Sequence, residues 1–240
     1  MSRSADLDRF YAILADLAAR VGGPRRLADC TGHQNWPDRG IYLFFGPDDA
    51  DGGRGRTGVD RVTRVGTHAV STGSGTSLWS RLRTHRGATR GTYEGGGNHS
   101  GSVFRKRVGE ALIEREGLDD EYPTWGEGSS AARERRLAEL PLERRASEYV
   151  RGIPFLWVAV DDEPGPDSDR ASLERNAIAL LSNRDREAVD PRPRTWLGGH
   201  SRSAAIRESG LWNVDGVDGA HDPSFLDRLA EYAAATDPVD

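Results

Sequence analysis

The chain has 240 residues, of which 36% are hydrophobic and 30% are charged, with a formal net charge of −5 and a single cysteine. This length suits one sizeable core or one domain with elaborations, while the lone cysteine excludes an intrachain disulfide and a zinc site built from cysteines. No apolar run approaches the length of a membrane span and the N-terminus contains no apolar signal region, so we expect a cytoplasmic protein without a membrane partner.

The first part of the chain predicts a helix followed by a β-hairpin. Apolar residues recur at helical spacing over 6–21, and a Gly-Gly pair follows that would end the helix. The short apolar run GIYLFF at 40–45 and the alternating segment RVTRVG at 61–66 predict two paired strands. The Gly-, Asp- and Arg-rich segment 47–60 between them predicts a long hairpin loop.

The middle of the chain predicts helices separated by a glycine-rich excursion. The segment 76–86 predicts a helix whose leucines face inward, and the segment 102–116 predicts an amphipathic helix. A further helical segment spans about 130–150 and is interrupted near Pro141. Between these helices, the segment 87–101 contains too much glycine to form regular structure or to pack a core.

The last part of the chain predicts a buried strand, a buried helix and a helical tail. The segment IPFLWVAV at 153–160 is continuously apolar, which is typical of a central strand. The segment 172–183 predicts a mostly buried helix, and two short helical segments close the chain, where we expect Trp196 and Trp212 to be packing anchors. The whole pattern predicts an α+β fold in which helices flank a small central β-sheet made of the hairpin and the central strand.

The charge of the chain is unevenly distributed. Residues 54–107 contain eleven cations and two acids, an excess of +9 that leaves −14 for the rest of the chain. A basic segment inside an acidic protein is typical of a protein that binds a polyanion. Nearly all of these cations are arginines, which suit phosphate oxygens and base edges, although a GC-rich genome produces the same bias.

Three polar residues stand in settings that suggest chemistry. Arg81 and His85 lie four residues apart on one predicted helix, so both project from one open face and could serve a phosphate and the nucleophile that attacks it. Glu174 shares a helix face with Ile178 and Leu181, and a carboxylate on an apolar stripe needs a partner such as a hard cation. Plainer explanations also exist: an ordinary charged surface for the pair, and a helix-start charge for the glutamate.

The order of these features resembles that of the GIY-YIG nuclease family. Gly40-Ile41-Tyr42 precedes a hairpin, and Arg64-Val65-Gly66 stands where the family has its second motif. The helix with Arg81 and His85 is most similar to the restriction-endonuclease branch, and Glu174 follows on a later helix. Alone, Tyr42 would be an ordinary packing aromatic, but together the motifs bracket most of the chain.

The resemblance implies a catalytic mechanism that uses a metal ion. Glu174 would hold a single divalent cation, Mg²⁺ or Mn²⁺, that polarises the scissile phosphate and stabilises the departing 3′ oxygen. Tyr42 would orient or deprotonate the attacking water. A free phenol ionises only near pH 10, so His85 could accept the Tyr42 proton. Arg81 would neutralise the charge that develops on the phosphate.

Some positions depart from the family pattern. Arg64 replaces the usual tyrosine of the second motif, which removes one phenol from the expected site. The late asparagine of the family is matched best by Asn183 and less well by Asn176. We expect one domain over 1–240. Its catalytic core would comprise 36–86 and 150–185, and an insertion at 87–149 would contact DNA. The segments 1–35 and 186–240 would be accessory extensions.

Contacts with DNA are expected mainly from the basic segment. Gly66 would let the backbone approach the substrate closely, and we expect His68 near the site. Arginine and asparagine side chains could read base edges, and a phosphate clamp without base reading is an equal alternative. The expected DNA-binding residues are Arg64, Gly66, His68, Arg83, Arg86, Asn98, His99, Arg105, Lys106 and Arg107.

The sequence therefore predicts a metal-dependent DNA endonuclease that acts in restriction or defence. Two alternatives stay open: a non-catalytic DNA-binding module, and a repair-type nuclease of the same fold that selects DNA structures. Cleavage of both DNA strands would call for a homodimer. The four residues Tyr42, Arg81, His85 and Glu174 favour the enzyme, because a pure binder has no use for a carboxylate beside a phosphate.

Overall fold

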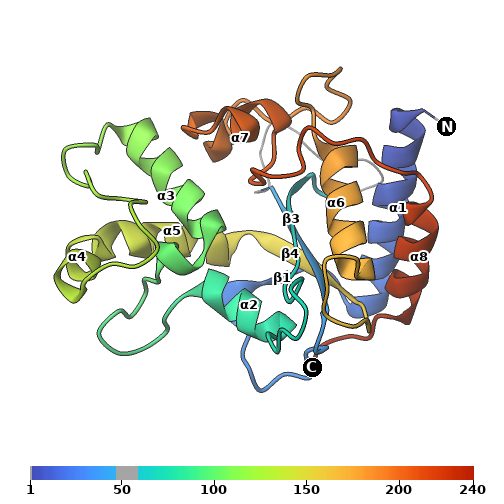
Figure 1. Cartoon of the computed structure of the whole chain (residues 1–240), viewed down its shortest axis with the longest axis horizontal. Coiled ribbons are helices and arrows are strands. Elements are labelled where there is room, and N and C mark those ends of the chain that lie inside the picture. Colours follow the sequence, from blue (N-terminus) through green and yellow to red (C-terminus); the bar gives the residue numbers. More distant parts are fainter. Residues whose placement is uncertain (1, 47–58) are drawn as a thin grey trace.

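A four-stranded antiparallel sheet lies at the centre of the computed structural model, which describes residues 2–46 and 59–240 (Figure 1). In spatial order the strands are β1 (Arg25–Arg26), β4 (Pro154–Ala159), β2 (Gly40–Phe45) and β3 (Val62–Gly66). The predicted hairpin and central strand are confirmed as β2–β3 and β4. Strand β1 was not predicted, because a strand of two residues is too short to show an alternating apolar pattern. The predicted loop at 47–60 lies outside the described residues, except for 59 and 60.

Three helices lie on one side of the sheet, namely α1 (Arg3–Val21), α6 (Asp169–Leu181) and α8 (Phe225–Ala235) (Figure 1). Helix α1 begins where the Ser2 hydroxyl accepts the N–H of Ala5 and ends at Gly22, whose φ of 80° favours glycine. Its apolar face is fully buried, as the periodicity predicted. Helix α6 positions Glu174, and its other inward residues complete the packing against β2 and β3.

The opposite side of the sheet carries α2 (Leu78–Arg86), α3 (Val103–Glu116) and α5 (Leu140–Gly152), with α4 (Arg133–Ala138) just before α5 (Figure 1). The predicted break near Pro141 is confirmed, because this proline lies in the first turn of α5 and starts a new helix. Alternation along β2 turns Tyr42 and Phe44 toward this side, where Tyr42 meets α2.

The glycine-rich segment 87–101 forms no regular structure before η3 and contributes no residue to the hydrophobic core, as predicted, but it packs against a buried arginine. The Arg105 guanidinium is completely buried and donates to the backbone carbonyl of His85 (2.8 Å), to the Glu143 carboxylate (2.6 Å) and to the Ser147 hydroxyl (2.7 Å). A Cβ at Gly97 would lie 2.3 Å from Cζ of Arg105, so glycine is needed here to admit the guanidinium. The short helix η3 (His99–Gly101) ends this segment.

The C-terminal tail extends the edge of the sheet beside β3. It contains η4 (Leu197–His200) and α7 (Ala204–Ser209), and the expected packing anchors Trp196 and Trp212 are both buried, with ring centroids 5.1 Å apart. The N–H of Trp212 donates to the carbonyl of Thr63 at 2.7 Å, which continues the hydrogen bonding of the strand. Among the helices of the described residues, none is both long and apolar enough to cross a membrane.

Candidate active site

Tyr42 and His85 form a buried pair that joins β2 to α2. The Tyr42 hydroxyl lies 2.8 Å from Nε2 of His85, and neither side chain is exposed. Tyr42 is also the cross-strand partner of Gly66, where a Cβ would lie 2.3 Å from the tyrosine hydroxyl. Gly66 is therefore required by the tyrosine ring, and this contact accounts for the glycine without any approach of DNA.

The imidazole of His85 is enclosed by aromatic rings and a serine. Phe44 and Phe104 pack edge-on against the ring, and Nδ1 lies 2.8 Å from the Ser102 hydroxyl. The expected open helix face is wrong for His85, because α2 packs this residue inward. Burial, reinforced by the cations of nearby arginines, holds the pKa of His85 well below its usual value, so the ring is neutral.

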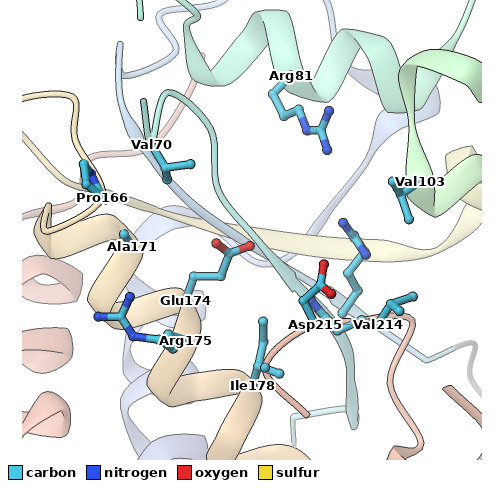
Figure 2. A pocket seen from close by; sticks show the side chains of 13 residues that line it. Val70, Arg81, Val103, Pro166, Ala171, Glu174, Arg175, Ile178, Val214 and Asp215 are labelled. Carbon is cyan, nitrogen blue, oxygen red and sulfur yellow. The ribbon is translucent and has the colours of Figure 1, made fainter. Parts of the chain in front are cut away.

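Arg81 lies between the tyrosine and the open space above the sheet. Electrostatic attraction by the Tyr42 phenol raises the pKa of the Arg81 guanidinium, against the effect of burial, and Glu174 adds to the attraction. Figure 2 shows Arg81 reaching from α2 toward the same space that the Glu174 carboxylate enters from α6. Its Nε is buried and has no hydrogen-bond partner among the described residues.

Glu174 presents its carboxylate to this space from α6. One oxygen, Oε1, accepts the N–H of Thr67 at 3.1 Å, which ties the glutamate to the backbone just after β3. Burial raises the pKa of the Glu174 carboxyl, while Arg64, the Thr67 N–H and Arg81 act in the opposite direction. A desolvated carboxylate held by one hydrogen bond has unused acceptor capacity, which suits a cation.

Arg64, the residue in place of the family's second tyrosine, is held rigidly in the same site. It is only 7% exposed, its Nη1 donates to the Trp212 carbonyl at 3.1 Å, and its guanidinium carbon lies 4.9 Å from the centre of the Phe104 ring. Its Nε has no hydrogen-bond partner among the described residues. The site thus contains a second fixed guanidinium where a phenol was expected.

A cavity of about 500 Å³ lies between α2, α6 and the tail (Figure 2). Arg64, Arg81 and Glu174 line it, whereas the fully buried Tyr42 and His85 do not. Its charged and amide side chains come from four separate parts of the chain: Arg64, Arg81, Glu174, Arg175, Asn213 and Asp215. Val70 and Val103 also line it and are 39% and 52% exposed, so the cavity is flanked by exposed apolar side chains. Three arginines against two carboxylates give the lining a positive balance, which favours an anion.

The asparagine that lines this cavity is Asn213, whereas Asn183, the expected match to the late asparagine of the family, does not line it. The Asn183 amide donates to the Asp190 carbonyl and accepts from Arg3, away from the cavity lining. Asn213 instead makes both amide hydrogen bonds to the backbone of Val65, at 3.1 and 2.8 Å, as a neighbouring strand would. The sequence predicted that the tail is accessory. The only pattern that could have pointed to Asn213 is its position directly after Trp212.

The basic triplet after the glycine-rich segment is not a free DNA clamp. Arg105 is buried in the ion pair with Glu143, so the expectation that it contacts DNA is wrong. Lys106 donates to the Gly126 carbonyl at 2.5 Å and Arg107 to Glu110 at 2.7 Å, so both are engaged within the segment 87–149. His99 is also buried, stacked on Trp125 and bonded to Glu143, which contradicts its expected DNA contact.

The other expected DNA-binding residues differ in their access to solvent. Arg83 and Asn98 are exposed, and the Asn98 side chain caps η3. Arg86 is half-buried, with its guanidinium bonded to the Cys30 carbonyl and lying over Trp79. His68 is buried beside the site, where Nδ1 bonds to the Thr76 carbonyl at 2.7 Å and burial lowers its pKa to about 4.

Comparison with known proteins and families gives one match. The family model described as the GIY-YIG domain matches residues 1–239, which includes both extensions as well as the hairpin and the glutamate helix. Neither the curated proteins nor the solved structures contain a significant match to the chain. Membership in this family implies a nuclease-type, DNA-cleaving function. Since the family model spans nearly the whole chain, this protein belongs to the GIY-YIG domain family.

Proposed function

We propose that the chain is a divalent-metal-dependent endonuclease that hydrolyses a DNA phosphodiester in the cavity between α2 and α6. The observation that carries this proposal is one cavity lined by the guanidinium groups of Arg64 and Arg81 and by the Glu174 carboxylate, with the buried Tyr42–His85 pair next to Arg81. A phosphate, its attacking water and a cation need these three kinds of groups together.

The donor set fits a hard cation that keeps most of its ligands as water. The described residues contain no cluster of three or more His, Cys, Asp or Glu side chains, which argues against a cage made wholly of protein ligands. Magnesium and manganese accept one carboxylate supplemented by water and phosphate oxygens, and Glu174 supplies such a carboxylate at the cavity. When bound, this ion would polarise the phosphate and stabilise the leaving oxygen.

The two arginines would hold the phosphate from opposite sides. Arg64 is immobilised by Trp212 and Phe104, so it offers a guanidinium that loses little conformational freedom on binding. Arg81 is attracted by both Tyr42 and Glu174, and its guanidinium lines the cavity. Together they would stabilise the additional charge of the pentavalent phosphate, where each preorganised donor contributes roughly 3–4 kcal/mol by analogy with oxyanion sites.

Tyr42 would orient or deprotonate the attacking water. Its side chain is fully buried, and Arg81 lies beside its hydroxyl. Phosphate binding would draw the Arg81 guanidinium from the phenol to a phosphate oxygen, and this shift would open the hydroxyl to the cavity. The catalytic tyrosine would then meet water only when a substrate phosphate is bound.

We favour a role in restriction or defence, in the cytoplasm. The protein would act as a homodimer when it cuts both strands. Among the expected DNA contacts outside the cavity, Arg83 and Asn98 are the two whose side chains are exposed. A repair-type nuclease would differ by cutting branched or nicked DNA in preference to linear duplex. A non-catalytic module would bind DNA without turnover, but the cavity carboxylate at Glu174 has no evident use in such a protein.

The test is incubation of the purified chain with plasmid, phage and branched DNA, with and without Mg²⁺ or Mn²⁺. We expect cleavage that needs the metal and disappears in the Glu174→Gln and Arg81→Ala variants. Binding without cleavage under every metal condition would support the non-catalytic alternative. Cleavage by Glu174→Gln at the wild-type rate would refute the site.

A further inference from the structure

The N-terminal end of α3 borders the cavity of the candidate active site. Val103, the first residue of this helix, lines the cavity and is 52% exposed. The N–H groups in the first turn of a helix point out of its end and have no partner within the helix. The Ser102 hydroxyl accepts the N–H of Arg105 at 3.3 Å, and the Ser102 carbonyl accepts that of Lys106 at 3.0 Å. The N–H groups of Val103 and Phe104 have no hydrogen-bond partner among the residues that the structure describes.

This end of α3 also carries an uncompensated partial positive charge. The peptide dipoles of a helix make its N-terminus positive, and helix N-termini therefore attract anions such as phosphate. The first turn of α3 contains no acidic side chain that could neutralise this charge. Arg105 in the same turn is balanced by Glu143 in the buried ion pair, so Glu143 is already occupied. A phosphate at this helix end would meet both the dipole and two unused N–H groups.

A second and independent feature at the same place is a buried arginine without a counter-ion. Arg64 is 7% exposed, and its guanidinium carbon lies 4.9 Å from the centre of the ring of Phe104, in the first turn of α3. Nη1 of Arg64 donates to the Trp212 carbonyl at 3.1 Å. Within the described parts of the chain, Nη2 has no hydrogen-bond partner and no carboxylate lies within ion-pair distance of the guanidinium. Buried charges are normally paired, so this arginine calls for an anion that the described residues do not supply.

Arg64 and the end of α3 meet in one cavity. Both Arg64 and Val103 line it, and Figure 2 shows Val103 beside the space that Arg81 and Glu174 enter. Burial raises the pKa of the Glu174 carboxyl, and the Arg64 cation is the largest effect in the opposite direction, so this arginine acts on the carboxylate from nearby. An anion bound by Arg64 would therefore lie inside the candidate active site.

We propose that Arg64 and the N-terminal end of α3 form one phosphate-binding site, in which Nη2 of Arg64 and the N–H groups of Val103 and Phe104 donate to a single phosphate of the DNA backbone. That the phosphate belongs to DNA rests on the proposed nuclease function. The phosphate that Arg64 holds thus receives neutral backbone donors as well as charged ones. Val103 acts here through its main chain, which is why its residue type gives no sign of this role in the sequence.

The site is tested without DNA or metal by titrating inorganic phosphate into the ¹⁵N-labelled full chain. We expect the amide protons of Val103 and Phe104 to shift to higher frequency, as amides do when they donate to an anion. The amides at the start of α1, which lies outside the cavity lining, are the comparison and should respond less. Arg64→Met should weaken the response of the two α3 amides. No shift at these amides, or the same shift in Arg64→Met, would overturn the proposal.

Val103→Pro removes one of the proposed donors and preserves the helix. Proline is favoured at the first helical position, and Ser102 before it already has the extended backbone, with φ −148° and ψ 103°, that a residue before proline adopts. Val103→Ala is the matched variant, because it also changes the apolar side chain but keeps the N–H. DNA affinity in EDTA should be at least roughly tenfold weaker for Val103→Pro than for Val103→Ala, since a hydrogen bond to a charged group is lost. Equal affinities of the two variants would contradict the proposal.

Two further measurements show whether the helix end and Arg64 share one phosphate. Val103→Pro removes no charge, so its slope of log affinity against log salt should equal that of Val103→Ala, whereas Arg64→Met should reduce the slope by about one unit. The affinity loss in the double variant of Arg64→Met and Val103→Pro should be smaller than the product of the two single losses, because each donor helps the other to hold the phosphate. Independent losses would mean two separate phosphates and would refute the shared site.

The outcomes also separate this site from the proposed function. Thermal melts show whether each variant is folded, and if Val103→Pro is unfolded, the phosphate titration of the wild-type chain decides, because it needs no proline variant. Phosphate binding at these amides in a chain that cleaves no DNA would refute the nuclease and support the phosphate site. Cleavage of DNA by a chain whose α3 amides do not respond to phosphate would refute the phosphate site alone.

Discussion

Gly66 and Tyr42 fit together as one unit: the tyrosine ring lies against the glycine of the adjacent strand, and a Cβ at position 66 would stand 2.3 Å from the tyrosine hydroxyl. The two short motifs of the family therefore meet across one register position of the β2–β3 hairpin. This contact explains why a glycine follows at the end of β3 although Arg64 has replaced the tyrosine of the second motif.

Gly66→Ala should displace Tyr42 and disturb its bond to His85. We expect the free energy of unfolding to fall by roughly 1–3 kcal/mol, the usual effect of overpacking, with a larger proportional loss of cleavage rate. Urea denaturation and single-turnover cleavage measure the two effects. Gly46→Ala is the matched control in the same hairpin, because a Cβ there meets only ordinary contacts at 3.5 Å and beyond. Wild-type activity in Gly66→Ala would show that the Tyr42 position is not critical.

Glu174→Gln should abolish cleavage while DNA binding stays equal or becomes tighter. The substitution keeps the shape of the side chain and its bond to Thr67 but removes the negative charge that would anchor the cation and that repels phosphate in its absence. DNA affinity measured in EDTA, together with cleavage in Mg²⁺, tests both parts. If the glutamate were only a favourable helix charge, its loss would cost about 0.3–1 kcal/mol and leave activity intact.

Arg64→Met should weaken DNA binding and reduce its salt dependence. Methionine preserves the packing against Phe104 but removes one cation from the cavity, so the slope of log affinity against log salt should fall by about one unit. Titrations at several salt concentrations give the slope. Arg133, which is exposed on α4 outside the cavity lining, provides the comparison through Arg133→Met. An unchanged slope in Arg64→Met would remove Arg64 from the phosphate site.

Arg105→Met should unfold or strongly destabilise the protein, and any loss of DNA binding should follow from this. Removing the guanidinium leaves the buried Glu143 carboxylate with one partner fewer. Breaking a buried ion pair in this way usually lowers the free energy of unfolding by roughly 3–5 kcal/mol. Arg83→Ala, on the exposed face of α2, should shift stability by less than about 0.5 kcal/mol and weaken DNA binding. Thermal melts and binding titrations compare the two. A stable Arg105→Met variant with lost binding would restore this residue to the DNA interface.

His68 should make folding stability fall at acidic pH. Burial, together with Arg170 and Arg81, lowers its pKa to about 4 in the folded chain, against about 6.5 when unfolded. Its contribution is therefore fully present above about pH 6.5 and is lost as pH falls toward 4. His68→Asn retains a donor for the Thr76 carbonyl and should show a flatter decline in the free energy of unfolding over this range. The exposed His33 is the control, and His33→Asn should follow the wild-type curve.

Local sequence patterns were sufficient for most of the secondary structure. Helical spacing predicted α1, α2, α3 and α6, and period-two alternation predicted β3, because these periods reflect which side chains a helix or strand must bury. A short apolar run ending at a glycine predicted β2. Four residues also carried enough chemistry in their order to indicate the family: Tyr42, Arg81, His85 and Glu174.

Tertiary packing decided which charged residues are available for function. Arg105 and Arg83 are both arginines on helices within the basic segment, yet one is enclosed by Glu143 and Ser147 and the other faces solvent. Burial of a charge depends on partners distant in sequence, which composition does not encode. The same reason separates Asn213 from Asn183: an asparagine reaches the cavity only because the tail pairs with the free edge of β3, and this pairing joins residues 148 positions apart.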